Sequence, residues 1–290
     1  MFPDADCPWS GATYAGVVFL DGELTPYLIE HELGHAFGLP HANATNCFKH
    51  SCVTLEYGDP YDTMGRGSGD FSAFAKVRLG WITRVTRVAG NGTYVVAALE
   101  HASASSQALV VTTAQDLYWI EYRTQRAPMN DAGVLVHVSP SPDLRTAVTG
   151  TAYNALVTNP GRRGRPELRT GDSFRYPAVF TLSVRRSGPN DVAVRFTWLD
   201  KTPPRAPRVT SSVVGGRIEV AVDPTREVGS GIAHYDVWVD HGPRVSVAGD
   251  ATEEPVRVGR PLPGTHTVHV VAVDRAGNRS APTVRQVRVP

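Results

Sequence analysis

The segment 31–41 constrains this chain more than any other stretch of its sequence. It reads HELGHAFGLPH, with three histidines and with Glu32 directly after the first of them. Residues four apart lie on one side of a helix, so the imidazoles of His31 and His35 can bind one zinc ion together. Glu32 would then lie beside the metal, where its carboxylate can accept a proton from a zinc-bound water. His41 can return as the third ligand, which leaves the fourth position open for water and substrate, as in a catalytic site.

The residues around this motif predict where its helix begins and ends. Thr25 suits the N-cap and Pro26 the first helical position, while Gly38 suits the end, so we expect a helix over 25–37. A second helix is expected over 71–79 from its capping residues and apolar spacing. The metal motif therefore lies on a helix and on the turn that follows it.

Two other residues compete for places in the metal site. Glu56 is an alternative third ligand, because in thermolysin-like peptidases a glutamate farther along the chain completes the site. A purely structural zinc site would need a fourth protein ligand, and Glu56 or His50 are the candidates near His41. The extended spacing of the motif favours His41 as the third ligand.

The composition excludes several classes of protein. A content of 41% hydrophobic and 20% charged residues is typical of a folded globular chain. The net charge of +1 argues against nucleic acid or an anionic membrane as a partner. The longest apolar stretches, such as Val17–Leu20 and 95–99, are far too short to cross a bilayer.

The chain divides into zones of different pattern. Residues 1–81 hold all three cysteines and both predicted helices, and 82–200 alternate between apolar and polar residues as strands do. A proline-rich linker is expected at 201–208, followed by a further β-rich domain at 209–290. We therefore expect an α+β protein in which two β-sandwich-like domains follow the metal motif. The predicted strands are 93–99, 108–112, 117–122, 134–138, 180–184, 192–198, 217–222, 233–239, 265–273 and 283–289; His137, His266 and His269 lie in such strands and are expected to be structural.

Met64 adds a second signal to the histidine motif. It lies in a turn-rich segment that starts 15 residues after His41, where the long metzincin pattern has a tight turn with a methionine below the zinc ligands. The motif together with 57–65 (YGDPYDTMG) and 71–81 (FSAFAKVRLGW) resembles the gametolysin family of metzincin metallopeptidases and the related immune-inhibitor-A-like peptidases of bacteria. Residues 118–123 and 133–137 resemble segments that follow the catalytic domain in such proteins, and 271–278 resembles a fibronectin-III-like or immunoglobulin-like module.

The resemblance implies a fold and an activity. Residues 1–81 would be the C-terminal part of a metzincin catalytic domain, with His31, His35 and His41 as zinc ligands, Glu32 as the base and Met64 in the Met-turn. The activity would be zinc-dependent cleavage of extracellular proteins or glycoproteins, at a cell-wall or matrix surface, by a secreted monomer. In this family a sheet that binds substrate normally precedes the zinc helix.

The start of the chain departs from the family pattern. Only 30 residues precede His31 and no signal peptide is visible, so we expect a truncated chain whose upper cleft wall is missing. The alternative is an inactive remnant that acts as a secreted binding or adhesion module. Cys47 and Cys52 can close a small loop by a disulfide bond, which would leave Cys7 to a partner upstream; three unrelated thiols are the other possibility.

Overall fold

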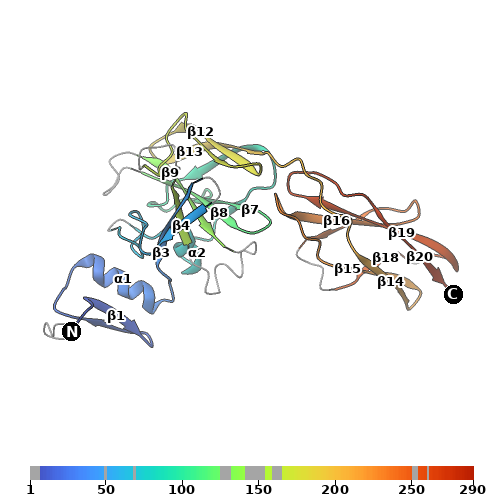
Figure 1. The fold of residues 1–290 in the computed structure, drawn as a ribbon, viewed down its shortest axis with the longest axis horizontal. Helices are drawn as coiled ribbons and strands as arrows, with labels where there is room; N and C mark the ends of the chain where they lie inside the picture. The colour runs from blue at the N-terminus through green and yellow to red at the C-terminus, as the bar shows by residue number, and fades with distance from the viewer. Residues whose placement is uncertain are drawn as a thin grey trace. The chain divides into compact units, whose positions relative to one another are not determined.

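The computed structural model describes residues 7–48, 51–67, 70–124, 132–140, 154–158, 165–249, 254–259 and 261–290. Their contacts divide the chain into two compact units (Figure 1). Unit 1 comprises Met1–Arg175 with Thr181–Thr197, and unit 2 comprises Tyr176–Phe180 with Trp198–Pro290. Within the described residues there are two helices and twenty strands, which confirms an α+β fold that is mostly β. Neither helix in this part of the chain is long and apolar enough to cross a membrane.

Unit 1 contains a β-hairpin packed on the first helix. β1 (Gly11–Tyr14) and β2 (Val17–Leu20) pair antiparallel around Ala15 and Gly16, which take φ values of 50° and 77°. Two successive positive φ values match the twist of a tight hairpin. α1 (Pro26–Ala36) lies alongside β1 (Figure 1), so the hairpin covers one side of the helix.

The helix predicted over 25–37 is α1, and its ends follow from the expected residues. The Thr25 side chain accepts a hydrogen bond from the Leu28 N–H at 3.3 Å, and Pro26 occupies the first position. Gly38 follows the last turn with φ 87°. Because glycine has no Cβ, the backbone adopts this left-handed conformation without strain and turns back toward the helix.

Seven strands form one sheet of unit 1, in the order β4-β3-β10-β9-β8-β7-β5. β3 (Ala42–Phe48) and β4 (Ser51–Leu55) come from the predicted segment 1–81, and the other five come from 82–200. These five are β5 (Val85–Arg87), β7 (Ala108–Thr112), β8 (Leu117–Arg123), β9 (Gly133–Ser139) and β10 (Asn154–Thr158). β3 pairs in parallel with β10, so the chain directly after the histidine motif is part of a sheet formed mainly by the second segment.

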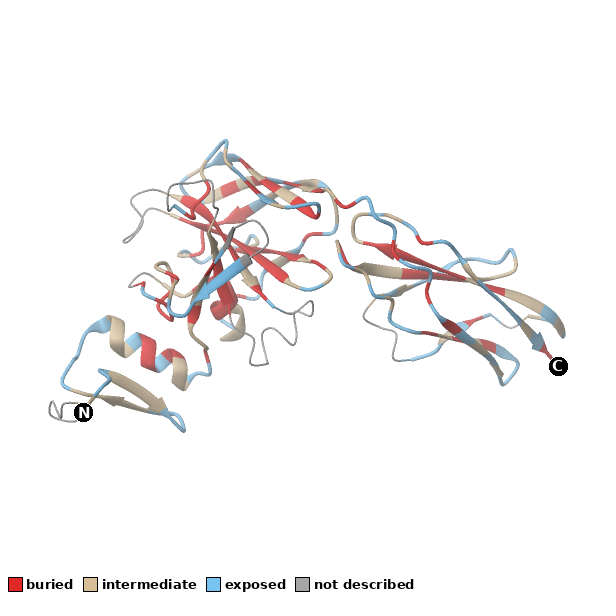
Figure 2. Cartoon of the chain, viewed as in Figure 1, coloured by how far each residue is buried: buried red, intermediate tan, exposed pale blue. Residues whose placement is uncertain are grey.

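The second predicted helix, over 71–79, is α2 (Ala73–Arg78), with Ser72 as its N-cap. Phe74 of α2 packs edge-on against Trp119 of β8, with ring centroids 5.6 Å apart. Every residue of β8 is buried (Figure 2). A strand that is buried on both faces must be covered on both sides, and α2 provides part of that cover.

The other large sheet of unit 1 has the order β11-β12-β13-β6. Its strands are β11 (Ser173–Tyr176), β12 (Phe180–Ser187), β13 (Asp191–Trp198) and β6 (Gly92–Ala97). Leu182 and Val184 are buried in β12, as are Val192 and Val194 in β13, while the residues between them are more exposed. This alternation is the pattern that predicted strands in this region.

Unit 2 is a β-sandwich of two sheets. One sheet has the order β14-β15-β18 and the other β17-β16-β19-β20. Their strands are β14 (Val209–Val214), β15 (Arg217–Val222), β16 (Ile232–Val239), β17 (Val245–Ala248), β18 (Val256–Val258), β19 (Gly264–Asp274) and β20 (Thr283–Val289). One cluster of buried side chains joins the two sheets, with Ile218 and Val220 from the first and Tyr235, Val237 and Val270 from the second. The apolar residues at alternate positions therefore form a shared core.

The predicted linker 201–208 has no helix or strand. Pro204 and Pro207 are buried, and just before them the carboxylate of Asp200 accepts hydrogen bonds from the Ser230 N–H and hydroxyl, both at 2.9 Å. Residues 201–208 belong to unit 2, and Asp200 connects the start of this segment to Ser230 just before β16.

Candidate metal centre

Helix α1 and the turn after it bring the three histidines together. His31 and His35 have ring centroids 4.8 Å apart. His41 lies 4.7 Å from His35 and 5.6 Å from His31, measured between ring centroids. One potential ligand atom from each ring lies within 4.8 Å of the other two. Among the described residues, this is the one group of three or more histidine, cysteine or acidic side chains placed to share a metal ion.

The first two imidazoles use their Nδ1 atoms for hydrogen bonds to the backbone. Nδ1 of His31 lies 2.8 Å from the carbonyl oxygen of Thr63, and Nδ1 of His35 lies 2.9 Å from the carbonyl oxygen of Leu39. A carbonyl oxygen can only accept, so both Nδ1 atoms are protonated and donate. In a neutral ring the lone pair is then on Nε2, which is the atom available to a metal.

Glu56 is the hydrogen-bond partner of the third histidine, His41. Its Oε1 atom lies 2.7 Å from Nδ1 of His41. A carboxylate in this position orients a ligating imidazole and fixes its tautomer. The structure therefore places Glu56 as the hydrogen-bond partner of a candidate ligand rather than as a ligand itself. His50, the other residue considered for a fourth position, lies outside the described residues.

Burial keeps the first histidine in the form that can bind a metal. His31 is only 5% exposed, and this burial lowers its pKa, although the hydrogen bond to the Thr63 carbonyl acts in the opposite direction. The nearby rings of His35 and His41 also lower the pKa of His31. The ring is therefore neutral near pH 7 and keeps a lone pair for coordination.

Glu32 is buried next to these rings, under the first strand. Its Oε2 atom lies 2.8 Å from the Thr13 hydroxyl of β1. A Cβ atom added to Gly11 would stand 2.8 Å from Cγ and Oε1 of Glu32, so β1 passes directly over the carboxylate. Together these elements enclose a cleft of about 460 Å³, lined by Gly11, Ala12, Thr13, Ala15, Gly16, His31, Glu32, His35, His41 and Tyr57. The short segment before His31 thus supplies part of the cleft wall that we expected to be missing.

Met64 is buried against the first helix. It is 1% exposed, and a methyl group added to Gly34 of α1 would overlap its sulfur atom. The Met64 N–H donates to Oδ1 of Asp62 and its carbonyl accepts from the Ala42 N–H, both at 2.8 Å. The turn is therefore packed under the helix that bears two of the histidines and is bonded to the residue after the third.

Tyr57 and Thr13 line the cleft, although the sequence analysis gave neither residue a role. The Tyr57 ring centroid lies 3.8 Å from that of His41 and 5.8 Å from that of His31. Tyr57 also has a φ of 56°, a backbone conformation that is uncommon outside glycine and that concentrates at functional sites. Its place in the turn-rich segment before Met64 is a weak sequence signal, and Thr13 has none.

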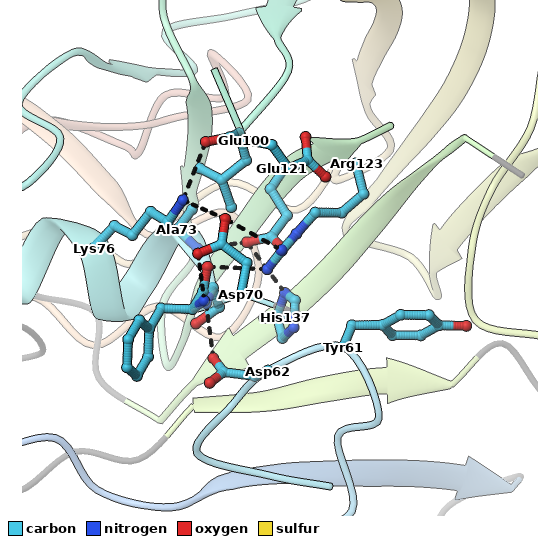
Figure 3. Close-up of polar contacts among 12 residues, drawn as sticks. Tyr61, Asp62, Asp70, Ala73, Lys76, Glu100, Glu121, Arg123 and His137 are labelled. Atoms are coloured by element: carbon cyan, nitrogen blue, oxygen red, sulfur yellow. Dashed lines mark hydrogen bonds and ion pairs between the residues drawn. The ribbon is translucent and has the colours of Figure 1, made fainter. Parts of the chain in front are cut away.

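A network of charged side chains joins α2 to β8 beside the loop that contains Met64 (Figure 3). Glu121 of β8 accepts hydrogen bonds from the Ala73 N–H at 2.6 Å and from Nε of Arg123 at 2.8 Å. Asp70 lies between two cations, with its Oδ2 atom 2.5 Å from Nζ of Lys76 and 3.9 Å from a guanidinium nitrogen of Arg123. Each buried charge therefore has a partner of opposite sign, as burial of an ion requires.

His137 connects this network to the loop that contains Met64. Its Nε2 atom lies 2.8 Å from Oδ2 of Asp59, and its Nδ1 atom lies 3.9 Å from Oε2 of Glu121. Burial by itself would lower the pKa of His137, but the carboxylates of Glu121 and Asp59 outweigh it and raise this pKa. In the same loop, burial and the neighbouring Asp59 raise the pKa of Asp62 to about 6. His137 thus lies between two carboxylates that favour its protonated form.

The β3–β4 hairpin contains two of the three cysteines. Cys52 is disulfide-bonded, and it lies directly opposite Cys47 in the register of the two strands. Residues directly opposite one another in an antiparallel pair lie within the Cα separation that a disulfide bond spans. This register agrees with the predicted Cys47–Cys52 bond, although the Cys47 side chain lies outside the described part. The main-chain N–H of Cys7 donates to Oδ2 of Asp21 at 3.1 Å.

Comparison with known protein families gives one match. Residues 1–130 match the family model described as gametolysin peptidase M11. This range includes the histidine motif, Met64 and the strands up to β8. The match supports a function of the metallopeptidase type for this part of the chain. A search of curated proteins finds no match.

Among solved structures, the chain is similar to two β-domain proteins. The PKD domain of the human VPS10 domain-containing receptor SorCS2 is 28% identical, with 31% of this chain and 76% of that chain covered and a TM-score of 0.25. A two-domain fibronectin type III segment of chicken tenascin is 17% identical, with 63% and 97% covered and a TM-score of 0.27. At these TM-scores neither likeness bears on function.

Proposed function

We propose that unit 1 is a zinc-dependent endopeptidase that hydrolyses peptide bonds of extracellular proteins. The observation that supports this most strongly is the convergence of three imidazoles and the Glu32 carboxylate on one cleft. The family match over residues 1–130 agrees with it, because that range contains all four side chains. No second function is favoured by a particular observation.

The donor set of the site fits a zinc ion. Zinc in proteins prefers imidazole nitrogen among its ligands, and catalytic zinc sites have three protein ligands and an open position. The Nδ1 atoms of His31 and His35 donate to carbonyl oxygens and that of His41 faces Glu56, so His31, His35 and His41 would bind through Nε2. Zinc bound there supplies Lewis-acid catalysis, which polarises a carbonyl group and lowers the pKa of water.

Glu32 is the general base of the proposed reaction. It accepts a proton from the attacking water and then transfers a proton to the amine that leaves, so one group serves both halves of the hydrolysis. The side chain is 5% exposed and lies against the cleft, which separates it from bulk water. A carboxylate in a fixed orientation at this point is what a proton-transfer step requires.

Strand β1 offers a binding edge for the substrate backbone. Gly11, Ala12 and Thr13 line the cleft, and within the described strands β1 pairs with β2 alone. A strand edge of this kind can bind an extended peptide by main-chain hydrogen bonds. We propose that the substrate lies along β1 and presents a peptide bond to Glu32.

The setting of the proposed enzyme is extracellular. The disulfide bond of Cys52 is typical of proteins in an oxidising compartment. We propose a secreted monomer that acts on protein or glycoprotein substrates at a cell-wall or matrix surface, with unit 2 as an attached β-sandwich module. This assignment of location and partners extends the peptidase proposal and is tested separately from it.

The test of the function is casein cleavage by the full chain, compared with Glu32→Gln and with Glu30→Gln as the matched control. Glu30 lies on the same helix but is exposed. Loss of a general base is expected to lower the rate about a hundredfold to ten-thousandfold, while zinc content stays the same. Undiminished cleavage by Glu32→Gln would contradict the role of Glu32. Zinc binding without any cleavage by the wild type would instead indicate an inactive remnant that binds surfaces.

A further inference from the structure

We propose that Thr13 is a positioning residue for Glu32, so that the β1–β2 hairpin sets the orientation of the catalytic base. This inference rests on the proposed function and adds a residue to it. Thr13 belongs to the hairpin that covers α1, and its hydroxyl reaches the helix directly above Glu32.

The Thr13 hydroxyl makes two contacts with the same residue. Its oxygen lies 2.8 Å from Oε2 of Glu32 and 2.8 Å from the main-chain carbonyl oxygen of Glu32. Both neighbours accept when the carboxylate is ionised, and the hydroxyl has a single proton to share between them. In this shared arrangement the hydroxyl lies between α1 and the Glu32 carboxylate, at a place from which it can donate to Oε2. The side chain of Glu32 is thereby held in one orientation.

Gly11 restrains the other side of the same carboxylate. A Cβ atom at this position would stand 2.8 Å from Cγ and Oε1 of Glu32 and 2.9 Å from Cδ1 of Leu28. The glycine therefore allows β1 to approach α1 closely, and any side chain there would displace Glu32. Oε1 points toward Gly11, which lines the cleft, whereas Oε2 is engaged by Thr13.

The two carboxylate oxygens of Glu32 therefore have different surroundings. Oε2 lies 2.8 Å from the Thr13 hydroxyl, and Oε1 lies on the side of Gly11, which lines the cleft. A general base must lie within hydrogen-bond reach of the proton that it accepts, and fixing it beforehand avoids an ordering cost during the reaction. The hairpin is thus part of the catalytic apparatus as well as a wall for the substrate.

The first test compares Thr13→Val, which keeps the shape but removes the hydroxyl, with Thr13→Ser, which keeps the hydroxyl. Thr93→Val, at an exposed position of β6, is the matched control. Loss of a hydrogen bond to a charged group is expected to lower kcat about tenfold to a hundredfold in Thr13→Val, with KM unchanged. Thr13→Ser is expected to restore the rate. A loss in Thr13→Ser as large as in Thr13→Val would overturn the inference.

The second test does not depend on activity. Crystal structures of the full chain, with and without zinc, are expected to show Glu32 in one orientation in the wild type and Thr13→Ser and displaced in Thr13→Val. If Thr13→Val disturbs the hairpin, Thr13→Ala removes the same hydroxyl without added bulk. An unchanged Glu32 in both variants would overturn the inference. If the wild type cleaves nothing but Glu32 moves as expected, the positioning role stands and the peptidase proposal fails.

Discussion

The loop around Met64 contacts two buried histidines whose pKa values shift in opposite directions. His31 is 5% exposed and donates from Nδ1 to the carbonyl oxygen of Thr63, whereas His137 is 1% exposed and lies between the carboxylates of Asp59 and Glu121. Burial lowers the pKa of His31, but for His137 the two carboxylates outweigh burial and raise the pKa. The two pKa values thus shift in opposite directions, because the partners of the two rings differ.

The difference in hydrogen-bond partners distinguishes a candidate metal ligand, His31, from a structural histidine, His137. A carbonyl partner at Nδ1 leaves Nε2 of His31 available to a ligand, while the carboxylates beside His137 favour its protonated form, which has no lone pair to offer. The first arrangement opens onto the cleft, and the second is enclosed between the loop and the sheet (Figure 3).

The largest expected effect comes from His137→Ala. This change leaves the buried carboxylates of Asp59 and Glu121 without their shared cation, and loss of one partner in a buried ionic group costs about 3–5 kcal/mol of unfolding free energy. Urea unfolding of the full chain measures it. His101→Ala is the control, because His101 is exposed. A change no larger than that of the control would show that His137 is not a bridge.

A smaller effect is expected from Glu56→Ala. The carboxylate orients His41 from behind, and loss of such a partner lowers metal affinity about tenfold to a hundredfold. The Glu56 side chain is 66% exposed, so the lower end of that range is expected. Competition with a chelator of known zinc affinity measures the change, with Glu30→Gln as the reference. Equal zinc affinities in Glu56→Ala and Glu30→Gln would show that Glu56 does not support the metal site.

The smallest expected effect is a pH dependence. A histidine whose pKa is raised by folding stabilises the protein fully below its unfolded pKa of about 6.5, and this stabilisation is lost as pH rises through the folded pKa. The difference in unfolding free energy between the wild type and His137→Gln should therefore shrink as pH rises from 6 to 9. The charged groups that face His137 are Glu121, Asp59 and Asp62. A difference that stays constant or grows with pH would contradict the raised pKa.

The sequence predicted those parts of the molecule that depend on local geometry. Spacing of four residues on a helix, a capping threonine and a glycine after the last turn were sufficient to place α1 and the three histidines. Alternation was sufficient for strands such as β7, which has the predicted bounds. Each of these features is decided by residues within a few positions of one another.

Features that depend on distant contacts could not be predicted in this way. β3 pairs with β10, more than a hundred residues farther along, and neither strand had been predicted. Thr13 reaches Glu32 only because a hairpin packs on α1, and a threonine in a short strand gives no sign of that contact. The sequence offers Glu56 as a possible ligand, but its hydrogen bond to His41 depends on where β4 ends.

The most direct test of the central claim is the zinc content of the full chain after dialysis, measured by atomic absorption. We expect about one zinc per chain in the wild type, loss of that zinc in His35→Ala, and retention in His241→Ala, whose histidine is exposed in unit 2. A wild type that retains no zinc, or a His35→Ala variant that retains as much as the wild type, would contradict a zinc centre formed by His31, His35 and His41.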